Sequence, residues 1–539
     1  MAIVIVDGQE ITLGDKERLN GIQAAARAGV SIPYYCWHPG LSVVASCRMC
    51  LVETGSRDPN TGAITMVPKL VPACQTPAKD GTVFVTNSDK VRQSRAQVEE
   101  ALLIDHPIDC PICDKAGECL LQDYHFEHGQ SERRADIRPF TSRRREMGDT
   151  VTLFVDRCVM CSRCVRFTRE ISGTKELMVV NRGSQEEIDV FPGYPLANKL
   201  SGNVVDLCPV GALGDKDFLY QQRVWFMKRH AGVCTRCSTG CSIYVEENQD
   251  TIYRLKPREN QHVNQWWICD EGRYDYHHVH DVRRLTGPHR RDTTGGELVA
   301  TEWSRLVIDL PQRFRAAQRV GAVFSPFLSV EEAYLLATWI RSLDPQAILA
   351  MGPVPVEGQD ERFPQGFVIH AEKCPNRRGV EEVLRHFTGH VVTFESFVDR
   401  VEAGELQAAW ISGGYRQPWI DNDTAARLSG LALLVVQDLF PSPLTNHAQY
   451  VLPSASYAER DGSYVNYQDR LQTAVWAVRA PAGVWSEAWL FWRLHGKQGL
   501  YNARLALDQA AAAVPFFAAA ADRVPETGVQ LKAVELVPT

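Results

Sequence analysis

Cysteine is the residue type whose number and position in this sequence could do chemistry. The chain has 16 cysteines among 539 residues, and all but Cys374 lie between Cys36 and Cys269. Disulfides are uncommon in a long chain that stays in a reducing compartment, and packing alone does not require so many thiols. Thiolates are ligands of structural zinc and of iron–sulfur clusters. The distribution therefore predicts four groups of metal ligands in the first half of the chain.

The first group lies in the runs YYCWHPGLSVVASCRMC and PACQTP and comprises Cys36, Cys47, Cys50 and Cys74. A two-iron cluster needs four thiolates, of which three usually come from one loop and the fourth from a distant strand end. The gap after Cys36 is longer than in plant-type ferredoxins, so the spacing alone leaves a structural zinc site open. The β-rich context favours a two-iron cluster.

The second group, in DHPIDCPICDKAGECLLQD, comprises His106, Cys110, Cys113 and Cys119. Three thiolates would leave one iron of a four-iron cluster without a protein ligand, and His106 stands just upstream at the end of a predicted helix. A neutral imidazole makes the cluster less negative than a fourth thiolate would. By analogy with histidine-ligated two-iron centres, we expect it to raise the reduction potential.

The third group combines three cysteines of DRCVMCSRCVRF with the cysteine of DLCPVGAL, which gives Cys158, Cys161, Cys164 and Cys208. Bacterial ferredoxins carry C-x2-C-x2-C-x3-C-P, in which the last cysteine ligates a second cluster. This sequence has no cysteine three residues after Cys164 and offers a remote Cys-Pro instead, so the four thiolates close one four-iron site. Arg157, Arg163 and Arg166 could raise its potential, but we expect them to form surface ion pairs.

The fourth group, in GVCTRCSTGCSIYV and WWICDEGR, comprises Cys234, Cys237, Cys241 and Cys269. A zinc ribbon can use similar spacing and remains an alternative. The position behind three predicted cluster sites favours another four-iron cluster. Cys374 is expected to be a buried or incidental thiol rather than a ligand.

The sequence lacks the motifs that indicate nucleotide binding and the long apolar segment that indicates a membrane span. No G-x-G-x-x-G follows a predicted strand and no G-x-x-x-x-G-K-[ST] occurs, so we expect no NAD or flavin on this chain. The net charge of -7 gives no electrostatic case for nucleic acid. The longest apolar candidate, 510–521, is too short to span a bilayer and contains Pro515. The N-terminal run MAIVIVDGQE does not read as a signal peptide, so a cytoplasmic location is expected.

The elements that must position the first two groups can be predicted from the residue pattern. Residues 2–13 should form two strands joined by a turn at Asp7-Gly8, and Asn20 should cap a helix that runs to Arg27. Strands are expected within 63–73 and at 83–85, which completes a β-β-α-β module of the β-grasp type. Residues 55–62 should form a surface insertion.

Ser88 should begin a helix that continues to about Ile104, with Val91, Val98 and Leu102 near one face. The arginine-rich stretch 131–149 is predicted to connect the second group to the third.

The second half of the chain has a different residue pattern. Apolar runs at 320–324, 347–351, 408–411 and 431–436 alternate with helical patterns at 329–343 and 396–404. This alternation predicts an α/β domain with a mainly parallel sheet. The alanine-rich segment 505–523 is expected to be helical or loosely packed.

The four groups in this order resemble one family, the large iron–sulfur subunit of respiratory complex I, called the G subunit of NADH-quinone oxidoreductase or, in mitochondria, the 75 kDa subunit. The likeness is carried by IPYYCWHPGL, SCRMCLVE, DHPIDCPICDKAGECLLQD, RCVMCSRCVRF and LSGNVVDLCPVGAL. The second half is similar, more weakly, to the family's degenerate molybdopterin-oxidoreductase domain, through AEKCPNRRGVEEVL, AAWISGGY and YVLPSASYAERDGSYVNYQDRLQ. In molybdenum enzymes of that superfamily a lysine and a glycine typically follow the last cluster cysteine, whereas this chain has Glu271 and Gly272.

The resemblance implies a multidomain protein with α+β and α/β parts, one 2Fe-2S cluster, three 4Fe-4S clusters and no molybdenum. The implied domains are a β-grasp 2Fe-2S ferredoxin domain at 1–87, a 4Fe-4S domain with one histidine and three cysteine ligands at 88–140, an all-cysteine ferredoxin-like 4Fe-4S domain at 141–226, a 4Fe-4S domain of the molybdenum bis-pterin type at 227–282 and a degenerate molybdopterin-oxidoreductase-like domain at 283–539.

The function that the resemblance implies is electron transfer within an NADH:quinone oxidoreductase. The chain would relay electrons from an NADH- and FMN-binding subunit toward quinone, while the whole complex translocates protons. It would contact that subunit and others of the peripheral arm, and reach the cytoplasmic face of the membrane only through them.

Three other functions remain open from the sequence. The first is the molybdenum or tungsten subunit of an NAD-linked formate dehydrogenase, which shares the cluster order. The second is the electron-transfer subunit of an NAD-reducing hydrogenase, although small forms of it would stop after the third group. The third is a zinc-stabilised interaction protein, against which the histidine of the second group and the remote Cys-Pro both weigh.

Overall fold

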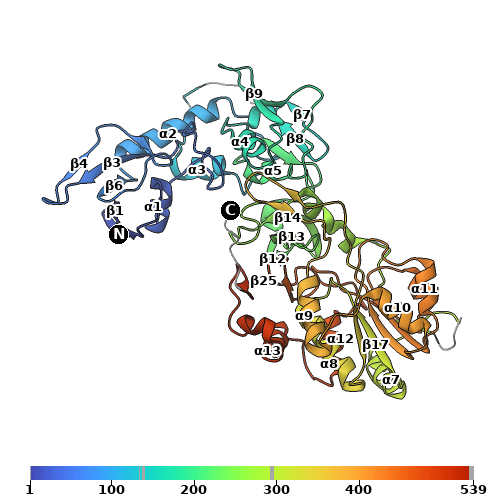
Figure 1. Cartoon of the computed structure of the whole chain (residues 1–539). Coiled ribbons are helices and arrows are strands. Elements are labelled where there is room, and N and C mark those ends of the chain that lie inside the picture. The colour runs from blue at the N-terminus through green and yellow to red at the C-terminus, as the bar shows by residue number, and fades with distance from the viewer. Residues whose placement is uncertain (1, 133, 136–139, 292–295, 533–539) are drawn as a thin grey trace. The chain divides into compact units, whose positions relative to one another are not determined.

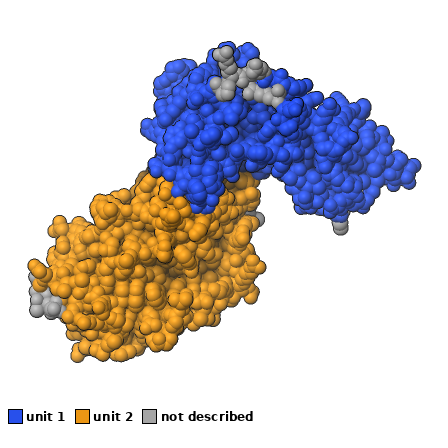
Figure 2. Space-filling view, turned by 180° about the vertical axis from the view of Figure 1, so that it is seen from behind, with its two compact units in different colours: residues 1–227, 363–366 blue, residues 228–362, 367–539 orange. Residues whose placement is uncertain are grey.

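The computed structural model describes residues 2–132, 134–135, 140–291 and 296–532. The chain divides into two compact units, which Figure 2 colours separately: unit 1 is 1–227 with 363–366, and unit 2 is 228–362 with 367–539. No helix within the described ranges is long and apolar enough to cross a membrane.

Unit 1 begins with a mixed sheet in the order β2-β1-β6-β3-β4, with β5 beside β3. Its strands are β1 (Ala2–Val6), β2 (Gln9–Leu13), β3 (Leu51–Arg57), β4 (Ile64–Met66), β5 (Val71–Pro72) and β6 (Thr82–Val85). The turn at Asp7 and Gly8 has positive φ at both residues, which closes the first hairpin as predicted. Helix α1 (Gly21–Arg27) begins with a capping box at Asn20 and packs Ile22 against the sheet. The predicted β-grasp module is confirmed.

Strand β3 departs from the sequence prediction, which included no strand at 51–57 and placed 55–62 in a surface insertion. Residues 51–57 form a strand that pairs with β6 and β4, so only the tip of the β3–β4 hairpin is inserted. Gly55 allows the pairing, because a Cβ there would lie 2.5 Å from the Thr65 carbonyl oxygen. The strand places Cys47 and Cys50 just before one of its ends.

Helix α2 (Asp89–Ile104) begins at the Ser88 cap, as predicted, and α3 (Leu120–His128) begins at Cys119. The buried side of α2 differs from the prediction, because it consists of Val91, Arg95 and Glu99 rather than an apolar row. Glu99 is fully buried because it accepts a hydrogen bond from the hydroxyl of Tyr35, the neighbour of Cys36. The helix thus places the hydrogen-bonded pair of Glu99 and Tyr35 next to the first cysteine group.

The rest of unit 1 contains a three-stranded sheet in the order β11-β8-β7 and a separate hairpin. Its elements are β7 (Arg144–Glu146), β8 (Val151–Phe154), α4 (Arg163–Glu170), β9 (Leu177–Val180), β10 (Glu187–Val190), α5 (Asn203–Leu207) and β11 (Leu213–Asp215). Strand β7 lies inside the stretch 131–149, which is therefore not merely a connection. Residues 133 and 136–139 of that stretch lie outside the described residues.

Unit 2 begins with an antiparallel sheet, β12 (Lys228–Val233), β13 (Ser242–Asn248) and β14 (Thr251–Pro257), followed by α6 (Asp270–Arg273). Its main sheet has the order β16-β15-β23-β22-β21-β17-β18. The five strands from β23 to β18 are parallel: β17 (Val320–Phe324), β18 (Ile348–Met351), β21 (Ala408–Ser412), β22 (Leu433–Asp438) and β23 (Tyr450–Pro453). Short strands β15 (His289–Arg290) and β16 (Val299–Ala300) extend one edge. The predicted α/β domain with a mainly parallel sheet is confirmed.

Helices cover both faces of this sheet (Figure 1). One face packs against α7 (Trp303–Ala316), α8 (Val330–Leu343), α9 (Arg377–Thr388), α12 (Glu487–Leu494) and α13 (Ala503–Ala513). The other packs against α10 (Phe394–Glu402) and α11 (Asn422–Leu428). The predicted alanine-rich helix ends before Pro515. Small sheets of β19 (Glu361–Arg362) with β20 (Val368–Ile369), and of β24 (Gly462–Val465), β25 (Arg470–Ala474) and β26 (Val529–Gln530), complete the unit.

The interior of unit 2 contains a cluster of three buried charged side chains. The Arg460 guanidinium lies 3.2 Å from a carboxylate oxygen of Glu332 and 3.0 Å from one of Glu487, and it donates to the Phe327 carbonyl. All three charged side chains are nearly inaccessible to solvent. Because one guanidinium serves two carboxylates, its removal would leave two buried acids without a cation.

We therefore predict that Arg460→Met destabilises unit 2 by about 3–5 kcal/mol. Burial raises the pKa of Glu332 to about 7, above its ordinary 4.5, so the stability that this group contributes is lost as pH rises through 7. The loss caused by Arg460→Met should consequently be larger at pH 8 than at pH 5. Chemical unfolding followed by tryptophan fluorescence measures both. Arg427→Met, which breaks a solvent-accessible ion pair with Asp399 and Glu402, is the control and should leave the stability nearly unchanged.

Four candidate iron–sulfur sites

The structure gathers the first group of cysteines at one end of the β-grasp sheet. Cys36, Cys47 and Cys50 lie on the loop between α1 and β3, and Cys74 follows β5. The Cys47 thiol and the backbone N–H groups of Ser46 and Cys47 donate to Cys36, which holds the pKa of Cys36 well below its ordinary value. Cys74 likewise donates to Cys50 and lowers the pKa of that thiol. The loop turns its amides inward through Ala45 and Arg48, which both have positive φ.

The second group forms between the end of α2 and the start of α3. His106, Cys110 and Cys119 line one pocket, together with apolar residues that include Ile108, Leu121 and Phe126. Burial, and next the charge of Arg157, lower the pKa of His106 to about 4, so its imidazole is neutral near pH 7, as a metal ligand must be.

Two further residues belong to the surroundings of the second group. Cys113 does not line the pocket, and its sulfur lies against Gly211, where a Cβ would come within 2.1 Å of it. His125 lines the same pocket as His106, and its Nδ1 is buried with no hydrogen-bond partner among the described residues. The structure therefore offers a second imidazole that sequence reasoning did not single out.

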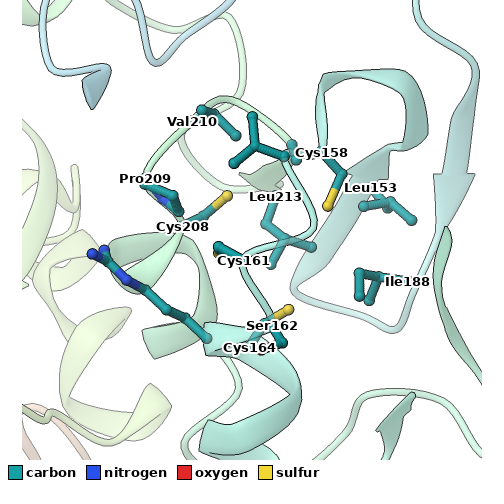
Figure 3. Close-up of a pocket in the computed structure, with 13 residues that line it drawn as sticks. Leu153, Cys158, Cys161, Ser162, Cys164, Ile188, Cys208, Pro209, Val210 and Leu213 are labelled. Atoms are coloured by element: carbon teal, nitrogen blue, oxygen red, sulfur yellow. The ribbon is translucent and has the colours of Figure 1, made fainter. Parts of the chain in front are cut away.

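The third group surrounds a single pocket, which Figure 3 shows in close-up. Cys158, Cys161, Cys164 and Cys208 line it with Leu153, Ile188, Val210 and Leu213. Three of these thiols come from the turn into α4, where Met160 and Ser162 have positive φ, and Cys208 comes from the end of α5. In Figure 3 the sulfur atoms of Cys158 and Cys208 point into this space from opposite sides. Burial raises the pKa of Cys161 to about 11, which reflects the apolar lining.

The expected surface ion pairs of Arg157, Arg163 and Arg166 are not formed. The side chains of all three residues are buried. Arg157 pairs with buried Asp109, next to Cys110, at 2.9 Å. Arg163 and Arg166 donate to backbone carbonyls instead. Their charge made a surface position the default expectation, and only the fold shows the carbonyls that they meet.

The fourth group lies in unit 2 between β12 and α6. Cys234, Cys237 and Cys241 occupy the β12–β13 connection, and Cys269 is the N-cap of α6. The Gly272 N–H donates to the Cys269 sulfur at 3.3 Å, and a Cβ at Gly272 would lie 2.8 Å from the Cys234 sulfur. Burial raises the pKa of Cys234 to about 12. Only glycine fits between these two thiols.

Glu271, at the position where the resemblance to molybdenum enzymes would place a lysine, forms an ion pair with the nearly buried ammonium of Lys373 at 2.8 Å. A lysine from a distant part of the chain thus reaches the fourth group. The neighbouring Cys374 is fully buried and packs against Phe327 and Tyr415, in agreement with the expectation of a structural thiol.

The donor chemistry of the four groups fits iron–sulfur clusters. All 16 cysteines are free thiols, most of them buried, with backbone amides directed at several of the sulfurs. Glycine leaves room where a Cβ would contact the sulfurs of Cys113 and Cys234. Across 2–132, 134–135, 140–291 and 296–532, no three His, Cys, Asp or Glu side chains are grouped closely enough to hold a single metal ion.

Comparison with known families gives the same order of regions. Residues 3–89 match the 2Fe-2S iron-sulfur cluster binding domain, 95–134 the NADH-ubiquinone oxidoreductase-G iron-sulfur binding region, and 148–214 the ferredoxin-like domain of NADH-quinone oxidoreductase subunit 3. Residues 227–281 match the molybdopterin oxidoreductase Fe4S4 domain, and 316–492 match molybdopterin oxidoreductase.

Curated relatives are similar over most of the chain. The G subunit of NADH-quinone oxidoreductase from Rickettsia felis is 32% identical over 478 residues, which cover 85% of this chain and 67% of that protein. The corresponding G subunit from Rickettsia typhi is 33% identical over 345 residues, 64% of this chain and 49% of that protein. The chain thus spans two thirds of the first relative and about half of the second. A solved NAD+-reducing [NiFe]-hydrogenase chain is 26% identical, with 41% of this chain and 91% of that one covered and a TM-score of 0.34.

The fold and the matched regions define an iron–sulfur protein with a molybdopterin-oxidoreductase-type domain. The chain belongs to the family of the NADH-quinone oxidoreductase G subunit.

We predict that Gly211→Ala selectively weakens the second site. The added methyl group would collide with the Cys113 sulfur, whose ligand position would have to shift. Low-temperature EPR of the dithionite-reduced protein should show loss of one four-iron signal with the two-iron signal retained. Gly287→Ala is the control, because nothing lies within 4 Å of a Cβ at that position. Identical spectra for the two variants would contradict the assignment.

Proposed function

We propose that this chain is an electron-carrying subunit of a membrane-associated NADH:quinone oxidoreductase. Electrons that a flavin-containing partner subunit takes from NADH would pass through the chain toward quinone, and the whole complex would couple this transfer to proton translocation. The chain would be peripheral, on the cytoplasmic side of the membrane, and bound there through partner subunits of the same complex. The name of the relatives, which are G subunits of NADH-quinone oxidoreductase, supports the reaction.

The proposed ligand sets are those predicted from the sequence. One 2Fe-2S cluster would bind Cys36, Cys47, Cys50 and Cys74. The three 4Fe-4S clusters would bind His106 with Cys110, Cys113 and Cys119; Cys158, Cys161, Cys164 and Cys208; and Cys234, Cys237, Cys241 and Cys269. The corresponding domains are 1–87, 88–140, 141–226 and 227–282, with 283–539 as a scaffold that holds no molybdenum.

Bound iron–sulfur clusters supply one-electron redox chemistry without proton transfer. The chain's own residues determine where that chemistry is possible. Leu153, Ile188 and Leu213 exclude water from the third site, which lowers the local dielectric and limits side reactions. The inward-facing amides near Cys36 and the buried guanidinium groups near Cys161 stabilise negative charge there.

The observation that carries the proposal is the agreement between matched regions and gathered side chains. Each of the three family regions in unit 1 contains one predicted set, and thiols of the third set line one common pocket. The Glu271–Lys373 pair supports the absence of molybdenum chemistry, because it places a carboxylate where those enzymes carry a free lysine.

The first test is the metal content. Anaerobically purified protein should contain about 14 iron atoms per chain and no stoichiometric molybdenum or tungsten. Elemental analysis combined with EPR of the reduced protein measures this, and one two-iron signal should accompany the four-iron signals. Zinc in place of iron would refute the proposal, and molybdenum or tungsten at one atom per chain would favour a formate dehydrogenase subunit.

The second test distinguishes the two histidines of the second site. His106→Cys should keep the cluster and lower its reduction potential, because an anionic thiolate replaces a neutral imidazole. His125→Cys, in the same pocket, is the matched control and should leave the potential unchanged. A redox titration followed by EPR compares them. A shift in the His125 variant alone would transfer the ligand role to His125.

A further inference from the structure

Helix α4, which contains Cys164 of the third site, carries three polar side chains in a row along one side. Arg163, Arg166 and Glu170 follow one another at i, i+3 and i+7, so they lie along one side of the helix. All three contact the loop that bears the first cysteine group. Arg163 donates to the Trp37 carbonyl at 2.6 Å, and Arg166 donates to the carbonyls of Cys36 and Ser42. Glu170 accepts from the backbone and hydroxyl of Ser42 at 2.8 and 2.6 Å.

The same two guanidinium groups also reach the backbone of the third site. Arg163 donates to the carbonyl of Leu207, the residue before Cys208, at 3.1 Å. Arg166 donates to the carbonyl of Cys161 at 3.2 Å. Each arginine therefore joins the main chain of one ligand set to the main chain of the other, although the two sets are widely separated in the sequence.

Within the described residues, neither of these two arginines forms an ion pair with a carboxylate, and Glu170 acts on Arg166 only through its charge. Both side chains are buried, with residue exposures of 6% for Arg163 and 2% for Arg166. Buried Arg157, by contrast, has Asp109. A buried cation requires an anion or a dense set of oxygen dipoles. Clusters ligated by four thiolates are anionic and become more so when reduced, so the first and third sites supply that charge.

We propose that Arg163 and Arg166 are positioning residues that clamp the first site to the third and favour the reduced state of both. This inference rests on the proposed function and deepens it. With clusters bound at both sites, one-electron transfer between them would oxidise one as it reduced the other, with no bond broken and no proton moved, and the two arginines would hold the donors of both sites in place. The clamp sets the separation of the two sites, and its two positive charges stabilise the added electron on either side.

The test compares Arg163→Gln and Arg166→Gln with Arg169→Gln in the full-length protein. Arg169 is on the same helix, and its side chain is more than half exposed and pairs with Glu170 rather than with either site. In a redox titration followed by EPR, each of the first two variants should lower the ratio of reduced to oxidised first and third clusters about tenfold at a fixed potential. A tenfold change in this ratio corresponds to a shift of about 59 mV in the reduction potential of a one-electron couple. The second and fourth clusters, and the Arg169 control, should not shift.

Arg163→Lys and Arg166→Lys separate the charge from the geometry. Lysine keeps the positive charge but cannot donate in several fixed directions. Both lysine variants should recover most of the potential yet weaken the magnetic interaction between the two reduced clusters. If a glutamine variant does not retain its clusters, the lysine variants provide the test instead. A magnetic interaction between the two reduced clusters that is as strong in the lysine variants as in the wild-type protein would then overturn the proposal.

The result that overturns the inference is distinct from the one that overturns the function. Unshifted potentials in both glutamine variants, or equal shifts of all four clusters, refute the arginine clamp while the wild-type spectra stand. Absence of the two-iron and four-iron signals from the wild-type protein refutes the proposed function itself.

Discussion

Buried sulfur anions need positive neighbours, and this constraint shapes unit 1. A thiolate removed from water is costly unless N–H dipoles or cations replace the solvent. Around Cys36 the chain meets this requirement with backbone amides, which left-handed residues such as Ala45 turn inward. Around Cys161 the charges of Arg163 and Arg166 on the adjoining helix favour the anionic form of the thiol, although burial opposes it more strongly. Local backbone conformation and long-range contact thus answer the same electrostatic demand.

Unit 2 meets a different demand, since most of it is a conventional layered α/β domain. Its parallel strands are buried on both faces, and several of its interior charges are paired within the unit, as in the cluster of Arg460, Glu332 and Glu487. The fourth site lies on the small antiparallel sheet before this domain. The ion pair of Glu271 with Lys373 ties the helix after Cys269 to a loop of the larger domain. The larger domain therefore contacts the fourth site through this ion pair.

Much of this arrangement could be predicted from local signals. The strand at 320–324 is a continuous apolar run, and the helix after Ser88 has a recognisable cap, so both were placed correctly. The four ligand groups were evident from spacing, and their assignment to clusters stays a prediction. Strand β3 was missed because LVETGSR lacks a strong apolar alternation, and its identity depends on pairing with β4 and β6.

The polar contacts were harder to predict because their partners are remote in the sequence. Arg166 reads as a surface residue until the fold brings the carbonyl of Cys36 to it, 130 positions away. Glu99 breaks the apolar face expected of its helix because the Tyr35 hydroxyl lies opposite. Nothing in the sequence around Gly211 or Gly272 predicts that either glycine lies against a cysteine sulfur. Their importance comes from sulfur atoms of distant residues.

The fourth donor of three ligand sets lies beside a secondary structure element that is separate from the other three donors, which has a consequence for how the protein matures. Cys74 comes after strand β5, Cys208 after helix α5 and Cys269 before helix α6. A nascent chain that has exposed only the clustered donors of such a set cannot yet enclose its metal centre, whereas all four donors of the second set lie within 14 consecutive residues. The sites would therefore become complete at different moments of synthesis: the first set once Cys74 has emerged, and the histidine-bearing set within the shortest interval after its own first donor.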